Sequence, residues 1–232
     1  MPQTWHWRER DFFEDLPREK AAFLARARRR ELRKREFVFH AGDAGTSCYY
    51  LESGSLRIFR ATVEGKEPMV FLRRQGEMFG LAEIMTGAQR QASAQAIASA
   101  VIFEIERKDF EALLADHYPL AKRVIQILGC RLRFLGEQVE GLMVSDVVTR
   151  ILKLLLQQAY PLLDDEEAWE QPVALPVTLT QEQIASLTGS CQPTVSETLR
   201  LLQEEGLIEM RRREIVLLNP LTALKRIEEP PC

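Results

Sequence analysis

Cysteines and long apolar runs are scarce in this chain of 232 residues, and each scarcity argues against a class of protein. The four cysteines, Cys48, Cys130, Cys191 and Cys232, lie far apart and form no CxxC pair, so the sequence predicts neither a disulfide framework nor a zinc site. The apolar runs are only a few residues long, and the amino end, MPQTWHWRERDFFED, is charged where a signal peptide would be apolar. We therefore expect a cytoplasmic protein with reduced thiols and no membrane segment.

Catalytic motifs are missing too. The sequence has no nucleotide-phosphate loop, no paired-histidine metal motif and no convincing nucleophile elbow, and we expect no enzyme activity. The net charge of -3 argues against a generally basic nucleic-acid surface, so any DNA contact must be local. Two basic clusters stand out, Arg26–Arg35 and Arg211–Arg213. The first is typical of a solvated face.

Residues 36–106 are rich in short β-type segments separated by glycines. Gly42, Gly54, Gly65 and Gly76 recur at the spacing expected of short antiparallel strands joined by turns. The only helix that fits there is a short one within 81–86. The expected strands are EFVFH, CYYLES, SLRIFRATV, PMVFLRR, QAIAS and VIFEIE. This part predicts a small β-barrel or roll.

A long helical pattern follows Pro119. Its apolar residues alternate at spacings of four and three, as in the seam of a coiled coil: Ala121, Ile125, Leu128, Leu132, Leu135, Val139 and Leu142. Such a narrow stripe favours pairing with a second chain, and we expect a dimer interface at the last six of these residues. A core helix of a monomer is the alternative, because Gly129, Gly136 and Gly141 each weaken the helix by roughly 1 kcal/mol relative to alanine. The seam ends near Ser145 and Asp146, where we expect the boundary between two domains.

The stretch TQEQIASLTGSCQPTVSETLRLLQEEGLI predicts two helices joined by a tight turn. Thr180 and Gln183 resemble a capping box at the start of the first helix. Gly189 permits a left-handed turn, and Pro193 fits only the first turn of the second helix. In the second helix Val195, Leu199 and Leu202 form an apolar stripe opposite Gln192, Ser196, Glu197 and Arg200. The pattern fits a helix-turn-helix that enters the major groove, with an ordinary helical hairpin as the alternative.

The following residues favour the first interpretation. Gly206 is expected to cap the second helix, and two short strands, LIEM and EIVLL, flank the basic tip Arg211–Arg213. A basic hairpin beside a recognition helix can reach the phosphate backbone of DNA. The sequence therefore predicts a winged helix-turn-helix.

The order of these parts resembles the cyclic-AMP receptor and fumarate-nitrate regulator (CRP/FNR) family of bacterial transcription factors. The matching pieces are AGDAGTSCYYLESGSLRIFR, GEMFGLAEIMTGAQRQASAQA, LMVSDVVTRI and LTQEQIASLTGSCQPTVSETLRLLQEEGLI. The resemblance implies an α+β fold: a double-stranded, jelly-roll-like β-roll sensor over 1–116, a coiled-coil dimerisation helix over 117–146, and a winged helix-turn-helix over 147–232. It also implies a homodimer that binds a palindromic operator in double-stranded DNA and contacts RNA polymerase.

The resemblance also implies roles for single residues. Those expected near base edges are Gln192, Pro193, Ser196 and Glu197, with Arg200 on the same face; those expected near phosphates are Thr180, Gln181, Thr194 and Arg213. The effector pocket would comprise Gly80, Leu81, Ala82, Glu83, Arg90 and Gln91 of the roll, with Leu132, Leu135 and Gly136 of the long helix.

Departures from the family pattern concern the effector. The glutamate that grips the ribose of cyclic AMP is replaced by Leu81, the serine after Arg90 by Gln91, and the threonine-serine pair of the long helix by Leu135 and Gly136. No cysteine precedes Cys48, which disfavours the iron-sulfur cluster of the other branch. We therefore expect neither cyclic AMP nor an iron-sulfur cluster.

Other effectors stay open. An apolar small molecule or a haem that carries a gas would suit an apolar pocket, and a redox or nitrosative signal is a further alternative. His6, between two tryptophans, is the candidate haem ligand; the further options are His40, His117, Met78, Met85 and Cys130. Cys48 and Cys130 are the candidate redox sensors. The alternative function is a cyclic-nucleotide-type binding module that regulates a protein partner.

Overall fold

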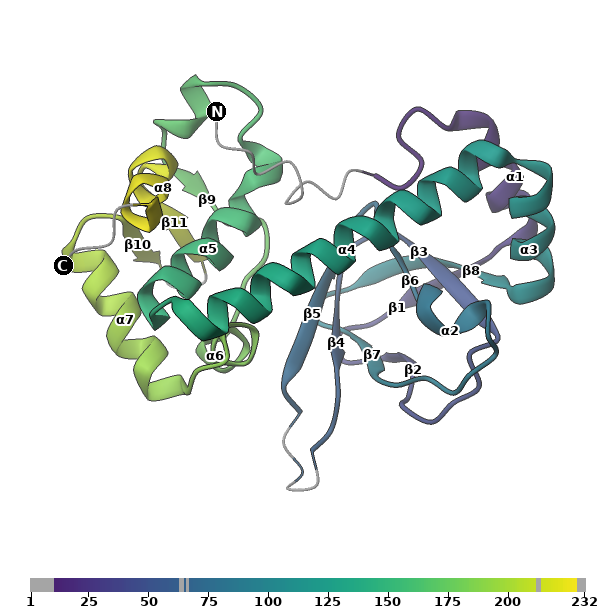
Figure 1. Cartoon of the computed structure of the whole chain (residues 1–232), viewed down its shortest axis with the longest axis horizontal. Helices are drawn as coiled ribbons and strands as arrows, with labels where there is room; N and C mark the ends of the chain where they lie inside the picture. The colour runs from purple at the N-terminus through teal and green to yellow at the C-terminus, as the bar shows by residue number, and fades with distance from the viewer. Residues whose placement is uncertain (1–10, 63–64, 66, 212–213, 229–232) are drawn as a thin grey trace. The chain divides into compact units, whose positions relative to one another are not determined.

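The computed structural model describes residues 11–62, 65, 67–211 and 214–228, and the chain divides into two compact units, one of residues 9–131 and one that contains 132–232 (Figure 1). None of the described helices is both long enough and apolar enough to cross a bilayer.

The first unit is a β-roll, as expected. Its strands form two four-stranded antiparallel sheets, in the orders β1-β8-β3-β6 and β2-β7-β4-β5. The first sheet comprises β1 (Arg28–Leu32), β3 (Ser47–Ser53), β6 (Met78–Phe79) and β8 (Ala100–Glu106); the second comprises β2 (Phe37–Phe39), β4 (Ser55–Phe59), β5 (Met69–Arg74) and β7 (Ser93–Ala96). The short helix α2 (Leu81–Ile84) lies within the range predicted for it.

Two clusters of buried side chains fill the roll. One lies between the sheets and includes Leu51, Leu56 and Ile102. The other joins β3 to the helices α1 (Pro17–Arg26), α3 (Arg107–Asp116) and the start of α4 (Tyr118–Val144), through residues such as Phe23 and Phe110. Arg123 of α4 donates to the carbonyl oxygens of Asp11, Phe12 and Glu14, at 2.8 to 3.2 Å. The first half of α4 is thus anchored to the roll.

The basic cluster Arg26–Arg35 holds a strand that the sequence analysis missed. Arg28 and Arg29 are exposed, as expected of a solvated face, but β1 pairs with β8 and buries Leu32. Arg30 donates to Glu104 of the paired strand at 3.0 Å. The segment QAIAS was also predicted as a strand, whereas β7 lies two residues earlier, at Ser93–Ala96.

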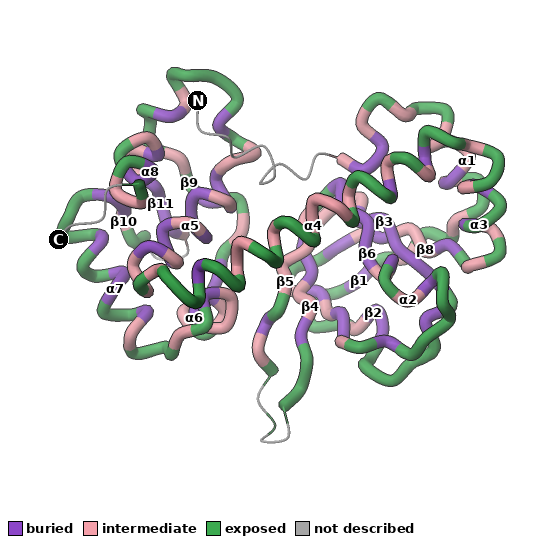
Figure 2. The backbone as a smooth tube through the Cα atoms, in the orientation of Figure 1, coloured by how far each residue is buried: buried purple, intermediate pink, exposed green. Residues whose placement is uncertain are grey.

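The long helix α4 is continuous through its glycines and ends where the seam was predicted to end. The helix α5 (Val147–Ala159) follows, with Asp146 as its N-cap: the Asp146 side chain accepts from the Thr149 amide at 2.7 Å. Figure 2 shows mostly exposed and intermediate positions along α4 and buried ones along α5. The two helices meet at Ser145 and Asp146, where the seam was predicted to end, whereas the two compact units divide between Arg131 and Leu132.

The rest of the second unit is the expected winged helix-turn-helix. The helices α6 (Gln181–Thr188) and α7 (Gln192–Glu204) pack on α5, and β10 (Ile208–Arg211) pairs with β11 (Glu214–Leu217). Two further elements were not predicted: β9 (Val173–Ala174) extends this sheet in the order β10-β11-β9, and α8 (Pro220–Glu228) packs on α5. Two short 3-10 turns, at Tyr160–Leu162 and Glu167–Trp169, lie in the connection between α5 and β9.

Candidate functional site

Local signals fix the start of α6 and the turn after it. The Thr180 hydroxyl accepts from the Gln183 amide at 3.2 Å, and the Gln183 side chain accepts from the Thr180 amide at 2.8 Å, which completes the predicted capping box. Gly189 ends the helix with a φ of 60°, in the left-handed region that favours glycine. The helix-turn-helix geometry therefore follows from the residues that predicted it.

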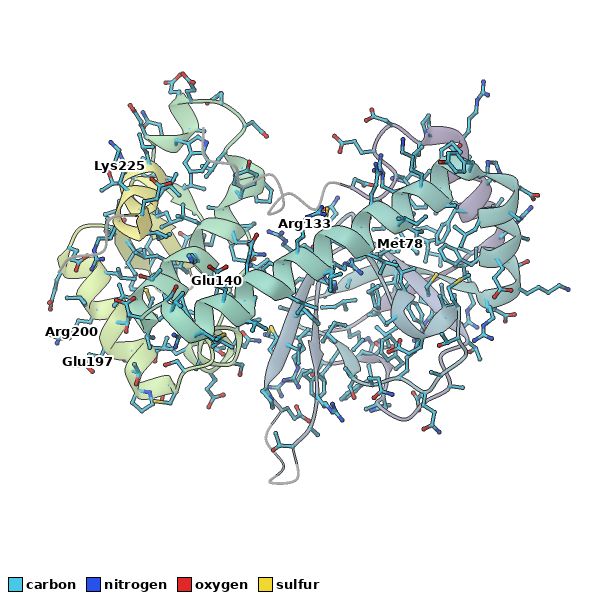
Figure 3. The ribbon with its side chains drawn as sticks, in the orientation of Figure 1. Met78, Arg133, Glu140, Glu197, Arg200 and Lys225 are labelled. Atoms are coloured by element: carbon cyan, nitrogen blue, oxygen red, sulfur yellow. The ribbon has the colours of Figure 1, made fainter. Side chains whose placement is uncertain are left out.

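The recognition helix α7 buries one face and exposes the other. Val195, Leu199 and Leu202 are buried against the domain, as predicted. The predicted contact residues lie on the outer face: Gln192, Pro193, Ser196, Glu197 and Arg200 are exposed and Thr194 is half-buried. Figure 3 shows the Glu197 and Arg200 side chains on the outer side of α7.

Polar contacts distinguish the side chains of this face. The side-chain amide of Gln192 donates from Nε2 to Oε1 of Gln181 at 2.9 Å, so the amino ends of α6 and α7 are linked. Arg200 pairs with Glu204 at 3.0 Å. Within the described part of the chain, the Glu197 side chain is exposed and has no hydrogen bond or ion pair, so its carboxylate is available to a ligand.

The N-cap of α7 is Cys191, whose exposed sulfur lies 3.1 Å from the Thr194 hydroxyl oxygen. The hydrogen bond with Thr194 lowers the pKa of this thiol. The thiol therefore lies at the amino end of the recognition helix, between the predicted contacts Gln192 and Thr194.

The basic tip of the wing is only partly within the described residues. Arg211 pairs with Glu209 at 2.9 Å and with Glu214 at 3.5 Å, so its charge is shared with two carboxylates of the same hairpin. Arg213, the predicted phosphate contact, lies outside the described residues.

In the roll, Arg90 lies within the predicted effector cassette and is only 3 % exposed. Its guanidinium donates to the Gly80 carbonyl at 3.0 Å, to the Ser47 carbonyl, and to the Glu83 carboxylate at 3.2 Å. It also lies 4.4 Å from the centre of the Phe39 ring. These neighbours surround the positive charge with acceptors and an aromatic face from the protein itself.

The other predicted pocket residues lie in different settings. Leu81 is buried in the core cluster beside Met78 and Ile84, whereas Ala82 and Gln91 are exposed. Leu132, Leu135 and Gly136 of α4 belong to the second compact unit. The structure thus brings together Gly80, Glu83 and Arg90.

The candidate ligand and redox residues lie apart. His40 is exposed and stacks on Phe37, with ring centres 4.1 Å apart. The Nδ1 atom of His117 lies 3.8 Å from a carboxylate oxygen of Glu19. His6 is outside the described residues. Burial raises the pKa of the Cys48 thiol, partly offset by the Arg90 charge, so this thiol is protonated at neutral pH. Among the described residues, no group of three or more His, Cys, Asp or Glu side chains could hold a metal ion.

The predicted seam of α4 is open to solvent in the single chain. Its six residues are between 41 % and 72 % exposed: Ile125, Leu128, Leu132, Leu135, Val139 and Leu142. Large apolar side chains at this exposure on one face mark an interaction surface.

Sequence reasoning missed Arg150 of α5, which donates to the Thr188 carbonyl at 2.8 Å and to the Ser145 carbonyl at 2.5 Å. The arginine therefore connects the segment after α4 to the last residue of α6. A single arginine in an otherwise amphipathic helix gives no sequence signal for such a bridge.

Comparison with known protein families agrees with both units. The family described as Cyclic nucleotide-binding domain matches residues 29–117, and the family described as Crp-like helix-turn-helix domain matches residues 149–227. The chain belongs to the CRP/FNR family of DNA-binding transcription regulators. In the family's terms, residues 29–117 are its cyclic-nucleotide-binding β-roll and 149–227 its helix-turn-helix.

Individual members of the CRP/FNR family are similar over most of their length. The "CRP-like cAMP-activated global transcriptional regulator" of Mycobacterium tuberculosis is 29% identical over 182 residues, which cover 78% of this chain and 79% of the relative. The "Cyclic AMP receptor protein" of Thermus thermophilus is 29% identical over 177 residues, covering 75% and 76% of the two chains. Among solved structures, FixK2 from Bradyrhizobium japonicum has a TM-score of 0.73 at 21% identity, covering 86% of this chain and 96% of its own. The similarity to FixK2 concerns the fold alone.

Proposed function

We propose that this CRP/FNR-family chain is a ligand-switched regulator that binds specific double-stranded DNA as a homodimer on a palindromic operator. The observation that carries the proposal is the outer face of α7, where the polar side chains Gln192, Ser196 and Glu197 are exposed at the amino end of a helix held in a winged helix-turn-helix. A helix of this kind fits the major groove, and its amino end reaches the base edges.

The side chains on α7 suit particular contacts. Gln192 can pair with adenine, and the free Glu197 carboxylate can accept from a cytosine amino group. Arg200 also lies on this face, but its guanidinium forms an ion pair with Glu204. Thr180, Gln181 and Thr194, with Arg213 of the wing, are proposed to contact phosphates, which supply affinity but no sequence information.

The exposed apolar stripe of α4 supports a dimer. A second copy of the same helix offers a face of matching shape and spacing, so the stripe on each helix can bury the other. Two α7 helices related by a two-fold axis would then read two half-sites of a palindrome. RNA polymerase is the expected protein partner on the DNA. No catalytic role is proposed.

The proposed effector is not cyclic AMP, although two of the similar regulators carry that nucleotide in their names. In this chain Glu83 is paired with Arg90, the one residue of the phosphate-gripping pair that is present, and Leu81 is packed in the core where the family has a glutamate. A cyclic phosphate would have to displace the Glu83 carboxylate, and the ribose would lack its partner. Each unmade hydrogen bond costs roughly 1 to 3 kcal/mol.

An apolar molecule or a haem-borne gas is the proposed signal. The described residues do not favour haem inside the roll, because Met78 and Leu81 lie in a packed core and His40 and His117 have partners elsewhere. A haem ligated by a histidine would therefore depend on His6. An absorbance spectrum after incubation with haem separates the two signals, since a sharp Soret band that is lost in His6→Ala is expected only for haem.

Selection of double-stranded DNA from a random pool tests the DNA-binding proposal. We expect a palindromic sequence, and Glu197→Ala should relax its specificity at one base-pair step by about 1 to 3 kcal/mol. Arg213→Ala should instead weaken all sequences alike and lower the salt slope by about one. Identical sequence profiles and salt slopes for the two variants would contradict this division of roles. A pool from which no sequence is selected would point to a protein partner instead.

Calorimetry with cyclic AMP tests the proposal on the effector. The expected result is no binding below the millimolar range, because the nucleotide would lose several hydrogen bonds at once. A micromolar dissociation constant would contradict it.

A further inference from the structure

A side chain from the last turns of α4 contacts the turn between α6 and α7. A Cβ atom built on Gly189 would lie 2.6 Å from Cδ2 of Leu142, so the leucine lies directly on the bare backbone of this glycine. Both residues belong to the second compact unit. Gly189 is therefore favoured for two reasons, its φ of 60° and the space that Leu142 occupies.

Arg150 holds the same turn from another side. Its Nε donates to the carbonyl of Thr188, the residue before Gly189, and its Nη1 donates to the carbonyl of Ser145, just after α4. Both carbonyls lie at helix carboxyl ends, where main-chain acceptors lack helical partners. Leu142 and Arg150 thus link the end of α4 to the turn by an apolar contact and by two charge-assisted hydrogen bonds.

Leu142 also belongs to the exposed stripe of α4. It remains 54 % exposed despite its contact with Gly189, and Val139, one turn earlier, is 57 % exposed. One side of the leucine therefore rests on the helix-turn-helix turn while the rest is open to a second copy of the helix.

We propose that Leu142 is a positioning residue that couples the dimer seam to the recognition helix. In the dimer, the second copy packs on Leu142 and fixes its rotamer, and the fixed side chain holds the Gly189 backbone. Close-packed contacts transmit such displacements because they leave no room to absorb them. Gly189 precedes Cys191, the N-cap of α7, by two residues, so a shift of the turn moves the amino end of α7. The inference rests on the dimer of the proposed function.

A double-mutant cycle on the dimer dissociation constant, measured by sedimentation of the full chain, tests the coupling. Gly189→Ala should push Leu142 out of its position and weaken the dimer, whereas the same substitution in a Leu142→Ala background should have little effect, because the shorter side chain leaves room for the new methyl group. We expect the two effects to differ by roughly threefold or more in the dissociation constant. Equal effects in the two backgrounds would overturn the inference.

Two matched controls isolate the contact. Gly206→Ala introduces a methyl group at a φ of 69° with no atom within 4 Å of it, so it has the same backbone strain without the contact, and its effect should add to that of Leu142→Ala. Leu135→Ala shortens another leucine of the seam, and its effect should add to that of Gly189→Ala. If either control pair shows the same coupling as the tested pair, the contact with Leu142 is not its source.

Hydrogen exchange gives the same test without a change at Gly189. The Ser190 amide, which donates to the Ala185 carbonyl at 2.9 Å, should exchange faster in Leu142→Ala than in Leu135→Ala when both are compared at the same fraction of dimer. Equal protection in the two variants would overturn the inference, and so would a wild-type chain that stays monomeric at all concentrations. None of these measurements uses DNA, so a failure to select a DNA sequence leaves the coupling result unaffected.

Discussion

Arg90 holds a positive charge inside the roll, where it depends on Glu83 and two main-chain carbonyls. Removing one partner of a buried pair leaves an uncompensated charge, so Glu83→Gln should lower the free energy of unfolding by about 3 kcal/mol. The measurement is urea denaturation of the full chain. The double variant Glu83→Met with Arg90→Met should lose less than the sum of its single changes, because it leaves no unpaired charge.

The exposed pair of Arg200 and Glu204 is the control for this prediction. Its nitrogen–oxygen distance is 3.0 Å, close to that of the Arg90 pair, but both side chains are more than half exposed. Glu204→Gln should therefore change the free energy of unfolding by less than about 1 kcal/mol. Similar losses for Glu83→Gln and Glu204→Gln would show that burial of Arg90 does not control the strength of its pair.

Tyr49 gives a prediction at alkaline pH. Burial, with the nearby Glu104 carboxylate, raises the pKa of Tyr49 from 10.0 to about 12. In the pH range between these two pKa values the folded chain keeps a proton that the unfolded chain releases, so the free energy of unfolding falls as the pH rises. Tyr49→Phe removes this group, and its stability should fall less steeply over this range, by up to about 1.4 kcal/mol per pH unit. Equal slopes for wild type and variant would contradict the shifted pKa.

At the scale of the elements, features set by neighbouring residues were predicted from the sequence. The start of α6 depends on Thr180 and Gln183, three residues apart, and the turn after it begins at Gly189, whose φ of 60° favours glycine. The seam of α4 was also read correctly as one continuous helix, since its apolar spacing persists over its length. Short-range hydrogen bonds and a regular period are present in the sequence itself, which is why these elements could be predicted.

Elements that depend on distant partners were missed. β1 lies in a run of basic residues, and its only buried side chain is Leu32; it forms because β8, about seventy residues later, offers an edge to pair with. The same holds for β9, two residues paired with β11. In the cassette, Glu83 was included in the predicted pocket without a partner, because nothing local indicates that its carboxylate meets Arg90 seven residues later across a loop. Tertiary pairing overrides local propensity at such places.

At the scale of the whole molecule, the net charge of -3 limits how this CRP/FNR regulator can bind DNA. A basic coat cannot supply the affinity, so it has to come from a few placed contacts repeated by symmetry. Two copies of a weakly binding half-site reader, held at a fixed spacing, bind far more tightly than one, because the second contact becomes intramolecular. The proposed dimer is therefore a condition for tight DNA binding.

The exposed stripe of α4 makes that condition testable. Leu132→Asp places a carboxylate at the middle of the seam, where a second helix would bury it without a partner. The dissociation constant of the dimer should therefore rise by more than about a hundredfold. Gln126→Asp adds the same charge at an exposed position off the stripe and should leave the dimer intact. Light scattering gives the mass of each variant, and DNA binding should be lost only in Leu132→Asp. An unchanged dimer in Leu132→Asp would remove this stripe from the interface, and the exposed leucines of α4 would then need a different partner.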